Sequence, residues 1–304
     1  MTEGNHREAL GHPSPWRLYS LIGLMVMLWA MNFLIAKVAL REFPAPLLSG
    51  LRVTLAAILI FPVYLWRRLR SPDGGEWTRE ELPALFLLGV VGVGLNQLFF
   101  VTGLARTSVA HASLLMGMTP ILVLVIATSL GQEKMRAMKL AGLAIALSGV
   151  GVLNSAPAKG SGVTALGDLL IVGAAATFAL FTVFGKRVTV RHGSVTVNTL
   201  AYSAGALVLS PVTIWQGSQF SFGSPSVWAW LGLVYMALFP SVVCYLIFYY
   251  ALTYIPASRV AAFSYLQPLL ATSMAAVFLS EPVTSGLVAG GALVLAGVYV
   301  TERA

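Results

Sequence analysis

The sequence contains one long segment twice. Residues 96–153 align without a gap with residues 244–301, and the constant shift is 148 positions, which is 268 minus 120 for Pro120 and Pro268. Matching leucines and alanines mean little, because apolar helices resemble one another in composition, but proline, glutamate and phenylalanine also recur in this register. The repeat predicts a fold built from two copies of one unit.

The composition predicts that both copies lie in a membrane. Of the 304 residues, 58% are hydrophobic and 10% are charged, and the mean hydropathy is +0.83, whereas about a quarter of a soluble domain is charged. A helix needs about 20 apolar residues to cross a bilayer, because each backbone amide must find its partner inside the segment. Ten segments fit this description: 17–40, 46–66, 82–104, 107–129, 136–154, 164–185, 195–215, 227–252, 257–279 and 283–301.

The repeat divides these segments into two equal halves. With a slip of one in the register, residues 29–37 also align with residues 178–186. We therefore expect a cytoplasmic tail over 1–16, a first five-helix repeat over 17–155 and a second over 163–301. Because five is odd, the second repeat enters the membrane from the opposite side. The predicted fold is an all-α integral membrane protein of ten transmembrane helices in two inverted five-helix repeats, an architecture suited to alternating access.

The basic residues predict the orientation in the membrane. With the N-terminus in the cytoplasm, 14 of the 19 lysines and arginines fall on the cytoplasmic side and 5 on the other. Both termini are expected in the cytoplasm, and the protein in the bacterial cytoplasmic (inner) membrane. The first apolar segment, about 24 residues long, exceeds the apolar core of a signal peptide. Because this asymmetry accounts for the net charge of +8, no nucleic-acid partner is expected.

Cysteine and histidine offer no site for a metal or other cofactor. Cys244 is the single cysteine of the sequence and lies in mid-helix, so it forms no internal disulfide. Two of the four histidines lie in the N-terminal tail, and the four do not form a metal-ligand cluster. We expect no cofactor and no metal.

Four stretches resemble a known family. They are Trp29-x-x-Asn32-Phe33-x-x-x-Lys37, Arg52-x-x-x-Ala56, the run 104–110 leading to Thr119-Pro120, and the run 251–257 leading to Gln267-Pro268. The sequence is similar here to the drug/metabolite transporter superfamily, specifically its EamA-type ten-helix branch, over the whole chain apart from about 16 leading residues. The resemblance implies transport of small metabolites, amino acids among them, through a central cavity between the halves, and it leaves the substrate open.

Charged residues within the predicted helices are candidates for the transport site, because ionisable groups are costly in a membrane. Lys37 and its counterpart Lys186 would attract a carboxylate at the two cavity mouths, or extend to the lipid headgroups. Arg52 lies about 10 Å into its helix and is interpreted as a structural clamp that faces protein. His111 would couple transport to protons, or be an ordinary polar residue at a helix end.

Neutral polar and aromatic residues form the rest of the candidate site. Aromatic faces with a few polar groups suit a zwitterionic or aromatic small molecule. Buried amides need hydrogen-bond partners, which a neighbouring helix or a substrate supplies, so each residue is as consistent with packing as with lining a cavity. The candidates are Trp29, Asn32, Phe33, Asn96, Gln97, Tyr245, Tyr249, Ser264, Tyr265 and Gln267.

Proline predicts where helices bend. Pro120 and Pro268 each remove one backbone hydrogen bond from the fourth and ninth segments, and a kink there would free carbonyls beside a cavity.

The acidic residues Asp168, Glu133 and Glu281 all lie near segment ends. A mid-membrane carboxylate, which a pump for lipophilic cations needs, is therefore missing from the sequence pattern, and the two glutamates are interpreted as structural.

These patterns favour a secondary transporter that moves a small polar metabolite, an amino acid or a related compound, with export as the expected direction. Its partners are the small-molecule substrate and the lipid bilayer, and monomer and homodimer both stay open. A channel or a lipid scramblase is the alternative. A membrane-embedded enzyme would need a catalytic constellation at membrane depth, which the sequence does not suggest.

Overall fold

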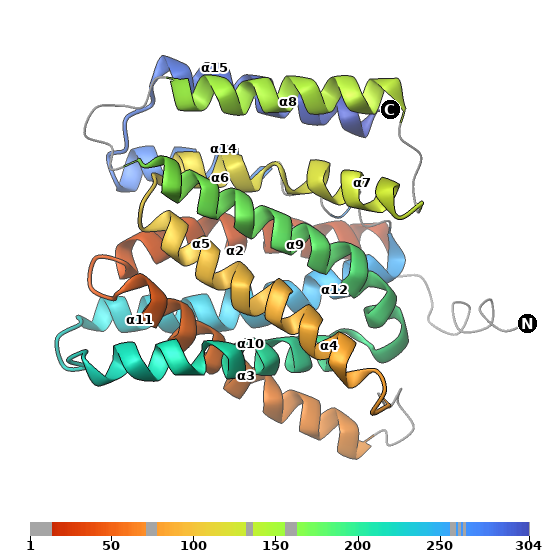
Figure 1. Ribbon diagram of the computed structural model, residues 1–304, viewed down its shortest axis with the longest axis vertical. Helices are drawn as coiled ribbons and strands as arrows, with labels where there is room; N and C mark the ends of the chain where they lie inside the picture. The colour runs from red at the N-terminus through yellow and green to blue at the C-terminus, as the bar shows by residue number, and fades with distance from the viewer. Residues whose placement is uncertain are drawn as a thin grey trace, which may run out of the picture.

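The computed structural model describes residues 14–70, 78–131, 136–155, 163–255, 260, 263 and 266–303. Within these ranges the chain is helical, and no β-strand occurs. Figure 1 shows the helices stacked in layers with their axes running in the same general direction. The expected all-helical fold class is thus observed over the described part of the chain.

The first half of the chain forms eight helical elements. They are α2 (Pro15–Ala39), α3 (Ala45–Arg70), α4 (Leu82–Gly89), η1 (Val90–Leu95), α5 (Asn96–Leu104), α6 (Val109–Met116), α7 (Thr119–Ser129) and α8 (Ala137–Ser155). The elements η1 and η2 are π-helical turns. The second half contains α9 (Ala165–His192), α10 (Ser194–Ser218), α11 (Val227–Met236), η2 (Ala237–Val243), α12 (Cys244–Tyr254), α14 (Leu266–Phe278) and α15 (Ser285–Glu302).

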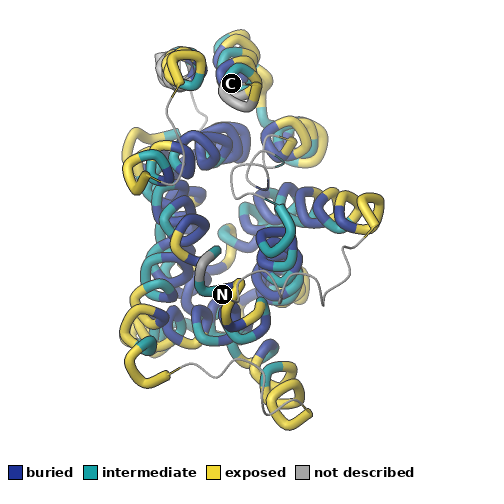
Figure 2. The backbone as a smooth tube through the Cα atoms, turned by 90° about the vertical axis from the view of Figure 1, so that its right-hand side faces the viewer, coloured by how far each residue is buried: buried dark blue, intermediate teal, exposed yellow. Residues whose placement is uncertain are grey.

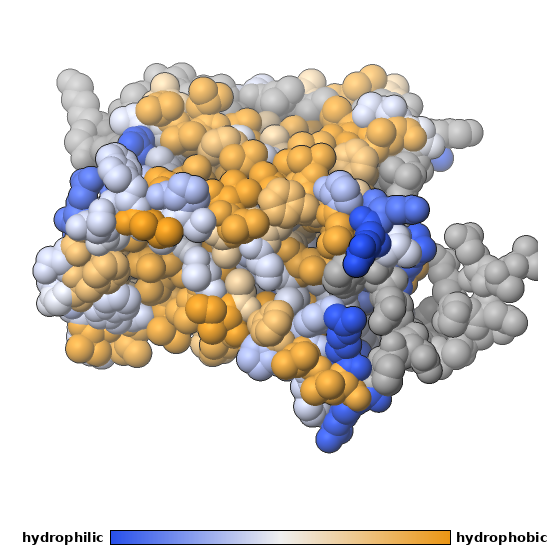
Figure 3. Space-filling view, turned by 60° about the horizontal axis from the view of Figure 1, so that its bottom comes forward, coloured by the Kyte–Doolittle hydropathy of each residue, from blue (hydrophilic) through white to orange (hydrophobic). Residues whose placement is uncertain are grey.

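Seven helical stretches within the described residues are long and apolar enough to cross a membrane. They are Pro15–Ala39, Ala45–Arg70, Leu82–Leu104, Val109–Ser129, Ala165–Lys186, Ser194–Ser218 and Val227–Tyr254. The other three expected segments contain shorter apolar helices, at Ala137–Ala146, Leu266–Phe278 and Ser285–Gly297. In Figure 3, hydrophobic side chains cover the middle of the visible face, and hydrophilic ones gather toward its left and right edges. This pattern fits helices that face lipid.

The two π-helical turns occupy equivalent positions in the repeat. Each lies between two α-helices of one span, and η1 moved by 148 positions covers 238–243, inside η2. Pro240 within η2 has no N–H to donate, and the hydroxyl of Ser241 donates instead to the carbonyl of Met236, 2.8 Å away and five residues back. A π-turn widens the helix and redirects its carbonyls, so these turns change what the spans present to the interior.

The span from Val109 to Ser129 is broken at its centre. Helix α6 ends at Met116 and α7 begins at Thr119, immediately before Pro120, so Gly117 and Met118 form a turn between them. A Cβ on Gly117 would lie 3.2 Å from the Pro268 ring, so the break in the first half touches the corresponding proline of the second. Gly117 leaves the space that this close approach requires.

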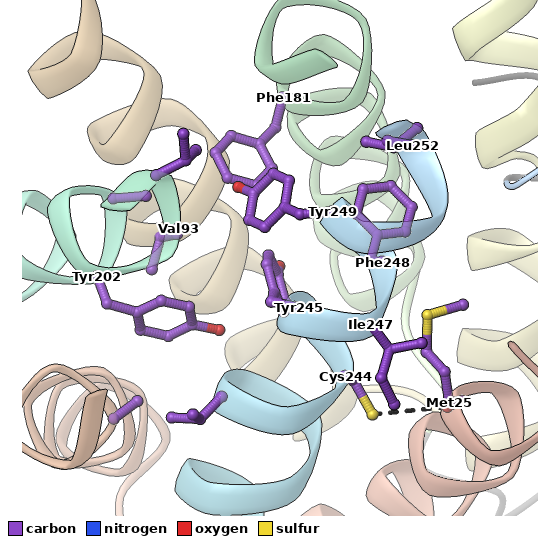
Figure 4. Packing of buried hydrophobic residues seen from close by; sticks show 14 of the residues in the cluster. Met25, Val93, Phe181, Tyr202, Cys244, Tyr245, Ile247, Phe248, Tyr249 and Leu252 are labelled. Atoms are coloured by element: carbon purple, nitrogen blue, oxygen red, sulfur yellow. Dashed lines mark hydrogen bonds between the residues drawn. The ribbon is translucent and has the colours of Figure 1, made fainter. Parts of the chain in front are cut away.

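Aromatic side chains of α12 form much of the core. Tyr249 packs on Phe181 of α9 with ring centroids 5.7 Å apart, and Tyr245 packs on Tyr202 of α10 at 5.5 Å. Figure 4 shows these rings converging from three helices. In Figure 2 the buried parts of the backbone gather toward the inside of the helix bundle, and the exposed parts lie mainly on its outside. Helix α12 is therefore held between α9 and α10.

Helices α8 and α15 form a pair at one edge of the molecule, at the top of Figure 1. A Cβ on Gly297 would overlap the backbone of Gly142 and Ala146, so the two helices approach with no side chain between them at this point. The pair lies away from the interior described next.

Candidate functional site

A cavity lies between the two halves. Its volume is about 60 Å³, well above the roughly 10–15 Å³ that one water molecule needs. Its lining combines aromatic rings with amide, hydroxyl and guanidinium groups from both halves. The lining residues are Trp29, Asn32, Phe33, Arg52, Asn96, Gln97, Phe100, Met116, Thr119, Phe178, Tyr245 and Gln267.

Several lining residues are counterparts in the repeat. Each pair is 148 or 149 positions apart and faces the same space: Trp29 with Phe178, Gln97 with Tyr245, and Thr119 with Gln267. Trp29 and Phe178 touch, with centroids 5.8 Å apart and rings at 88°. The cavity therefore lies where equivalent surfaces of the two halves meet.

The aromatic wall is fixed by edge-to-face packing. Phe33 of α2 and Phe100 of α5 lie 5.2 Å apart at 76°. Trp29 contacts Tyr245 at 6.1 Å, and its indole Nε1 donates to the carbonyl of Pro240 at 3.1 Å. Such tilted pairs are the favoured arrangement of aromatic rings and hold these side chains in place.

The buried amides of α5 are ordered by a hydrogen-bond chain. Asn96 donates through Nδ2 to the carbonyl of Ala174 in α9 at 2.8 Å, and Gln97 donates through Nε2 to Oδ1 of Asn96 at 3.0 Å. Gln97 Oε1 and Asn32 Oδ1 are buried and accept no hydrogen bond from the described part of the protein. Two acceptors at one cavity are thus left to a ligand or water.

Arg52 is the charged member of the described lining. Arg52 is 2% exposed, and its Nε donates a hydrogen bond to Ser241 Oγ of η2 at 3.1 Å. Its Nη1 is buried and has no hydrogen-bond partner among the described residues. The interpretation of Arg52 as a structural clamp explains its hydrogen bond to Ser241, but it does not explain why Nη1 has no partner.

Lys37 is not among the residues that line this cavity. Its ammonium donates to the carbonyls of Leu104 at 2.8 Å and Thr107 at 2.6 Å, where α5 ends. A helix C-terminus has unpaired carbonyls and partial negative charge, so a lysine there is favourable. Lys37 therefore joins α2 to the end of α5.

His111 belongs to a second polar cluster at the same end. His111 Nδ1 lies 3.3 Å from Asp168 Oδ2, and the hydroxyl of Thr107 donates to the other oxygen of Asp168 at 2.5 Å. The carboxylate of Glu281 accepts from the backbone N–H of Val109 at 2.9 Å, at the start of α6. A separate cavity of about 200 Å³ adjoins His111 and Glu281. This cluster joins α5, α6, α9 and the segment before α15.

The remaining candidates are distributed differently. Tyr249 is fully buried in the α12 core and does not line the central cavity, and its hydroxyl has no partner in the described structure. Pro120 and Pro268 are buried near the starts of α7 and α14. Ser264 and Tyr265 lie outside the described residues. Among the described residues, no group of three His, Cys, Asp or Glu side chains is arranged to hold a metal ion.

Sequence reasoning missed several lining residues, although the repeat carried a signal for two of them. Moving Trp29 by 149 positions gives Phe178, and moving Gln267 back by 148 gives Thr119. Met116 had no comparable signal, because an isolated apolar residue in an apolar helix has no distinguishing pattern.

Carboxylates also join loops to helix starts at the two ends of the bundle. Glu42 accepts hydrogen bonds from the backbone N–H and the hydroxyl of Ser226 at the start of α11, and the backbone hydrogen bond is the main reason that the pKa of Glu42 is lowered. Glu81 accepts from the Thr78 N–H at 2.9 Å and pairs with Arg191. The Thr78 hydrogen bond and the charge of Arg191 lower the pKa of Glu81.

Apolar helices of membrane-spanning length, present in two matching halves around one cavity, define an integral membrane protein of the transporter type. The EamA-like transporter family model matches residues 16–155 and again residues 165–303. The chain belongs to this family and carries its domain twice.

Individual relatives agree with this assignment. A transporter of Archaeoglobus fulgidus, described as uncharacterized, is 30% identical over 293 residues, covering 94% of this chain and 97% of the relative. A probable amino-acid metabolite efflux pump of Salmonella typhimurium is 27% identical over 291 residues, 91% of this chain and 92% of the relative. A probable terminal-alkyne amino-acid exporter of Streptantibioticus cattleyicolor is 27% identical, covering 92% of this chain and 91% of the relative.

One crystal structure matches with a TM-score of 0.67 at 21% identity, covering 95% of this chain and 98% of the other. At this level of identity the likeness shows a shared fold.

Proposed function

We propose that the protein is a secondary transporter that exports a small polar metabolite, an amino acid or a related compound, by alternating access around the central cavity. The observation that carries the proposal is the lining of this cavity: residues equivalent in the repeat face one space that holds buried, unpaired polar atoms. Unpaired buried atoms also occur in the packed core, at Tyr249 for example, so the support comes from their gathering with a charged group, Arg52, around one cavity, where a ligand site uses such groups to select its ligand.

The proposal includes ten membrane-spanning helices in two inverted halves. The seven long apolar stretches and the three shorter apolar helices together supply ten. The helices need not have equal apolar length, because broken and short helices are common in transporters.

Two contacts support the inversion. Glu42 at the end of α2 binds Ser226 at the start of α11, and Arg191 at the end of α9 pairs with Glu81 just before α4. Arg191 is the counterpart of Glu42 at 149 positions, and Ser226 is the counterpart of Thr78 at 148. In Figure 1 the start of α11 lies at the left end of the molecule, and the start of α4 lies at the right. The partner residues differ, since Arg191 pairs with Glu81 and not with Thr78, but contacts between equivalent segments at opposite ends are what an inverted repeat produces.

Export and the amino-acid class are supported by the names of relatives, which include an amino-acid metabolite efflux pump and an amino-acid exporter. The 14-to-5 asymmetry of basic residues supports cytoplasmic termini in a bacterial inner membrane. The substrate and the bilayer are the proposed partners.

A channel or scramblase is the alternative function. It would not need two equivalent arrangements of the halves, so its flux would neither saturate nor show counterflow. The test is uptake of a labelled solute into proteoliposomes that are preloaded with the same solute in unlabelled form. The solutes tested are amino acids, nucleosides and sugars. We expect saturable, counterflow-stimulated uptake; linear flux without counterflow would overturn the carrier mechanism.

Variants connect this transport to the cavity. We expect Asn32→Ala and Gln97→Ala to lower transport while leaving insertion into the membrane intact. Gln219→Ala, an exposed amide in the loop after α10, is the matched control. Unchanged kinetics in both cavity variants would remove the site from the transport path.

A further inference from the structure

We propose that Arg52 binds the carboxylate of the cargo and that Asn32 and Gln97 accept hydrogen bonds from its ammonium group, which makes the cargo a zwitterionic amino acid. This inference rests on the proposed transport function and specifies the chemistry of its site.

The charge of Arg52 is not balanced within the described structure. Its one hydrogen bond is to a neutral hydroxyl, that of Ser241, and no described carboxylate pairs with it. A buried cation without a counter-ion is expensive, and the cost is larger within a membrane. A guanidinium has a planar set of donors that matches the geometry of a carboxylate. Nη1 of Arg52 has no partner in the described structure and can donate a hydrogen bond to such a group.

The cavity also has unpaired acceptors. Gln97 uses its Nε2 on Asn96, so the oxygen of its amide is the atom left for a ligand. Asn32 Oδ1 is likewise unpaired. Amide oxygens repel a carboxylate and accept hydrogen bonds from an ammonium group. The lining therefore offers a cationic group that requires an anion and amide oxygens that require a donor.

The aromatic wall adds to the ammonium side. Trp29 and Tyr245 border the same cavity, and the face of an aromatic ring attracts a cation. The described lining contains no acidic residue, so an amine without a carboxylate would leave the charge of Arg52 unbalanced and add a second cation.

Lys37 does not compete for this role. Both of its hydrogen bonds go to backbone carbonyls at the end of α5, and it does not line the cavity. Among the described residues that line the central cavity, Arg52 therefore supplies the positive charge that can bind an anionic group.

A purely structural Arg52 would hold η2 through Ser241 and would be indifferent to the charge of the cargo. The structural role of Arg52 and its role in binding a carboxylate can be distinguished by comparing the affinity for an acid with the affinity for its uncharged amide. A structural role changes both affinities together, whereas a carboxylate receptor changes their ratio.

The experiment uses the full-length protein in detergent and measures thermal stabilisation by each of the twenty common L-amino acids. The strongest binder is then compared with its carboxamide, its decarboxylated amine and its deaminated acid. We expect the amino acid to bind most tightly, and the amide and amine at least about tenfold more weakly, as the loss of a hydrogen bond to a charged group implies.

Variants assign these preferences to residues. Arg52→Gln should remove the preference for the acid over its amide, and Arg52→Lys should keep part of it. Gln97→Leu should remove the preference for the amino acid over its deaminated acid. Arg106→Gln is the matched control, because this exposed arginine bonds to the Thr102 carbonyl away from the cavity.

Two outcomes overturn the inference. One is that none of the twenty amino acids stabilises the protein; the other is that Arg52→Lys, if folded, weakens the acid and the amide equally. Saturable counterflow of a sugar or nucleoside alone would leave the transporter proposal standing while rejecting the amino-acid site. Absence of counterflow for every solute would reject the transporter itself.

Discussion

The indole Nε1 of Trp29 donates a hydrogen bond to the carbonyl oxygen of Pro240, 3.1 Å away. Trp29 belongs to the first helix of one half, and Pro240 lies in the π-helical turn of the other half. In this turn the N–H of Cys244, four residues after Pro240, donates to the carbonyl of Phe239 rather than to that of Pro240, as the π-helical register requires. Trp29, a side chain of the cavity wall, is thus held by a hydrogen bond from the first half to the π-helical turn of the second.

Trp29→Phe should remove this hydrogen bond while keeping an aromatic ring in the wall. We expect a stability loss of about 0.5–1.5 kcal/mol, the usual net value of such a bond, together with slower transport. Thermal unfolding and counterflow measure the two effects. Trp228→Phe is the control, since Trp228 is exposed. Equal behaviour of the two variants would show that the bond to Pro240 is without consequence.

Lys37→Met should act on stability. The ammonium of Lys37 satisfies two carbonyls at the end of α5, and losing hydrogen bonds to a charged group costs about 1.5–3 kcal/mol. We expect a lower unfolding temperature and an unchanged KM for the transported solute. A raised KM with an unchanged unfolding temperature would instead place Lys37 in contact with cargo.

The sequence predicted much of the cavity because its residues stand out against an apolar background. Residues that line it and were expected to do so are Trp29, Asn32, Phe33, Asn96, Gln97, Tyr245 and Gln267. Buried amides are conspicuous in a membrane helix, since each must be satisfied. Asn32 and Phe33 follow Trp29 at three- and four-residue steps, so the three share one face of α2, and all three line the cavity.

The partners of the charged residues were not predictable in the same way. Lys37 bonds to carbonyls 67 and 70 positions away, and Arg52 bonds to a hydroxyl 189 positions away. Depth in a helix indicates that a charge is costly, but not whether protein or ligand balances it. The π-turns were also hidden, because hydropathy does not distinguish a π-turn from an α-helix.

The contact between Glu42 and Ser226 should make stability depend on pH. Hydrogen bonds from Ser226 lower the pKa of Glu42 below its ordinary value of 4.5, so the stabilisation is present above that value and is lost as the pH falls through the lowered pKa. We expect Glu42→Gln to lower the unfolding temperature slightly around pH 7, with the difference shrinking as the pH falls below 4.5 and through the lowered pKa of Glu42. A double-mutant cycle with Ser226→Ala isolates the pair, and a coupling that persists at low pH would contradict this origin.

Labelling should reveal the membrane side of equivalent loops in the two halves. Cys244 is replaced by serine, and single cysteines are introduced at Thr78, before α4, and at Ser224, before α11, both exposed. In the inverted arrangement, a membrane-impermeant maleimide added to intact cells reacts at position 224 and reaches position 78 only after the cells are permeabilised. Because the two loops precede equivalent helices, their opposite accessibility would follow directly from the odd number of helices in each half. Labelling of both positions from the same side would rule out inversion, and with it the structural basis proposed for alternating access.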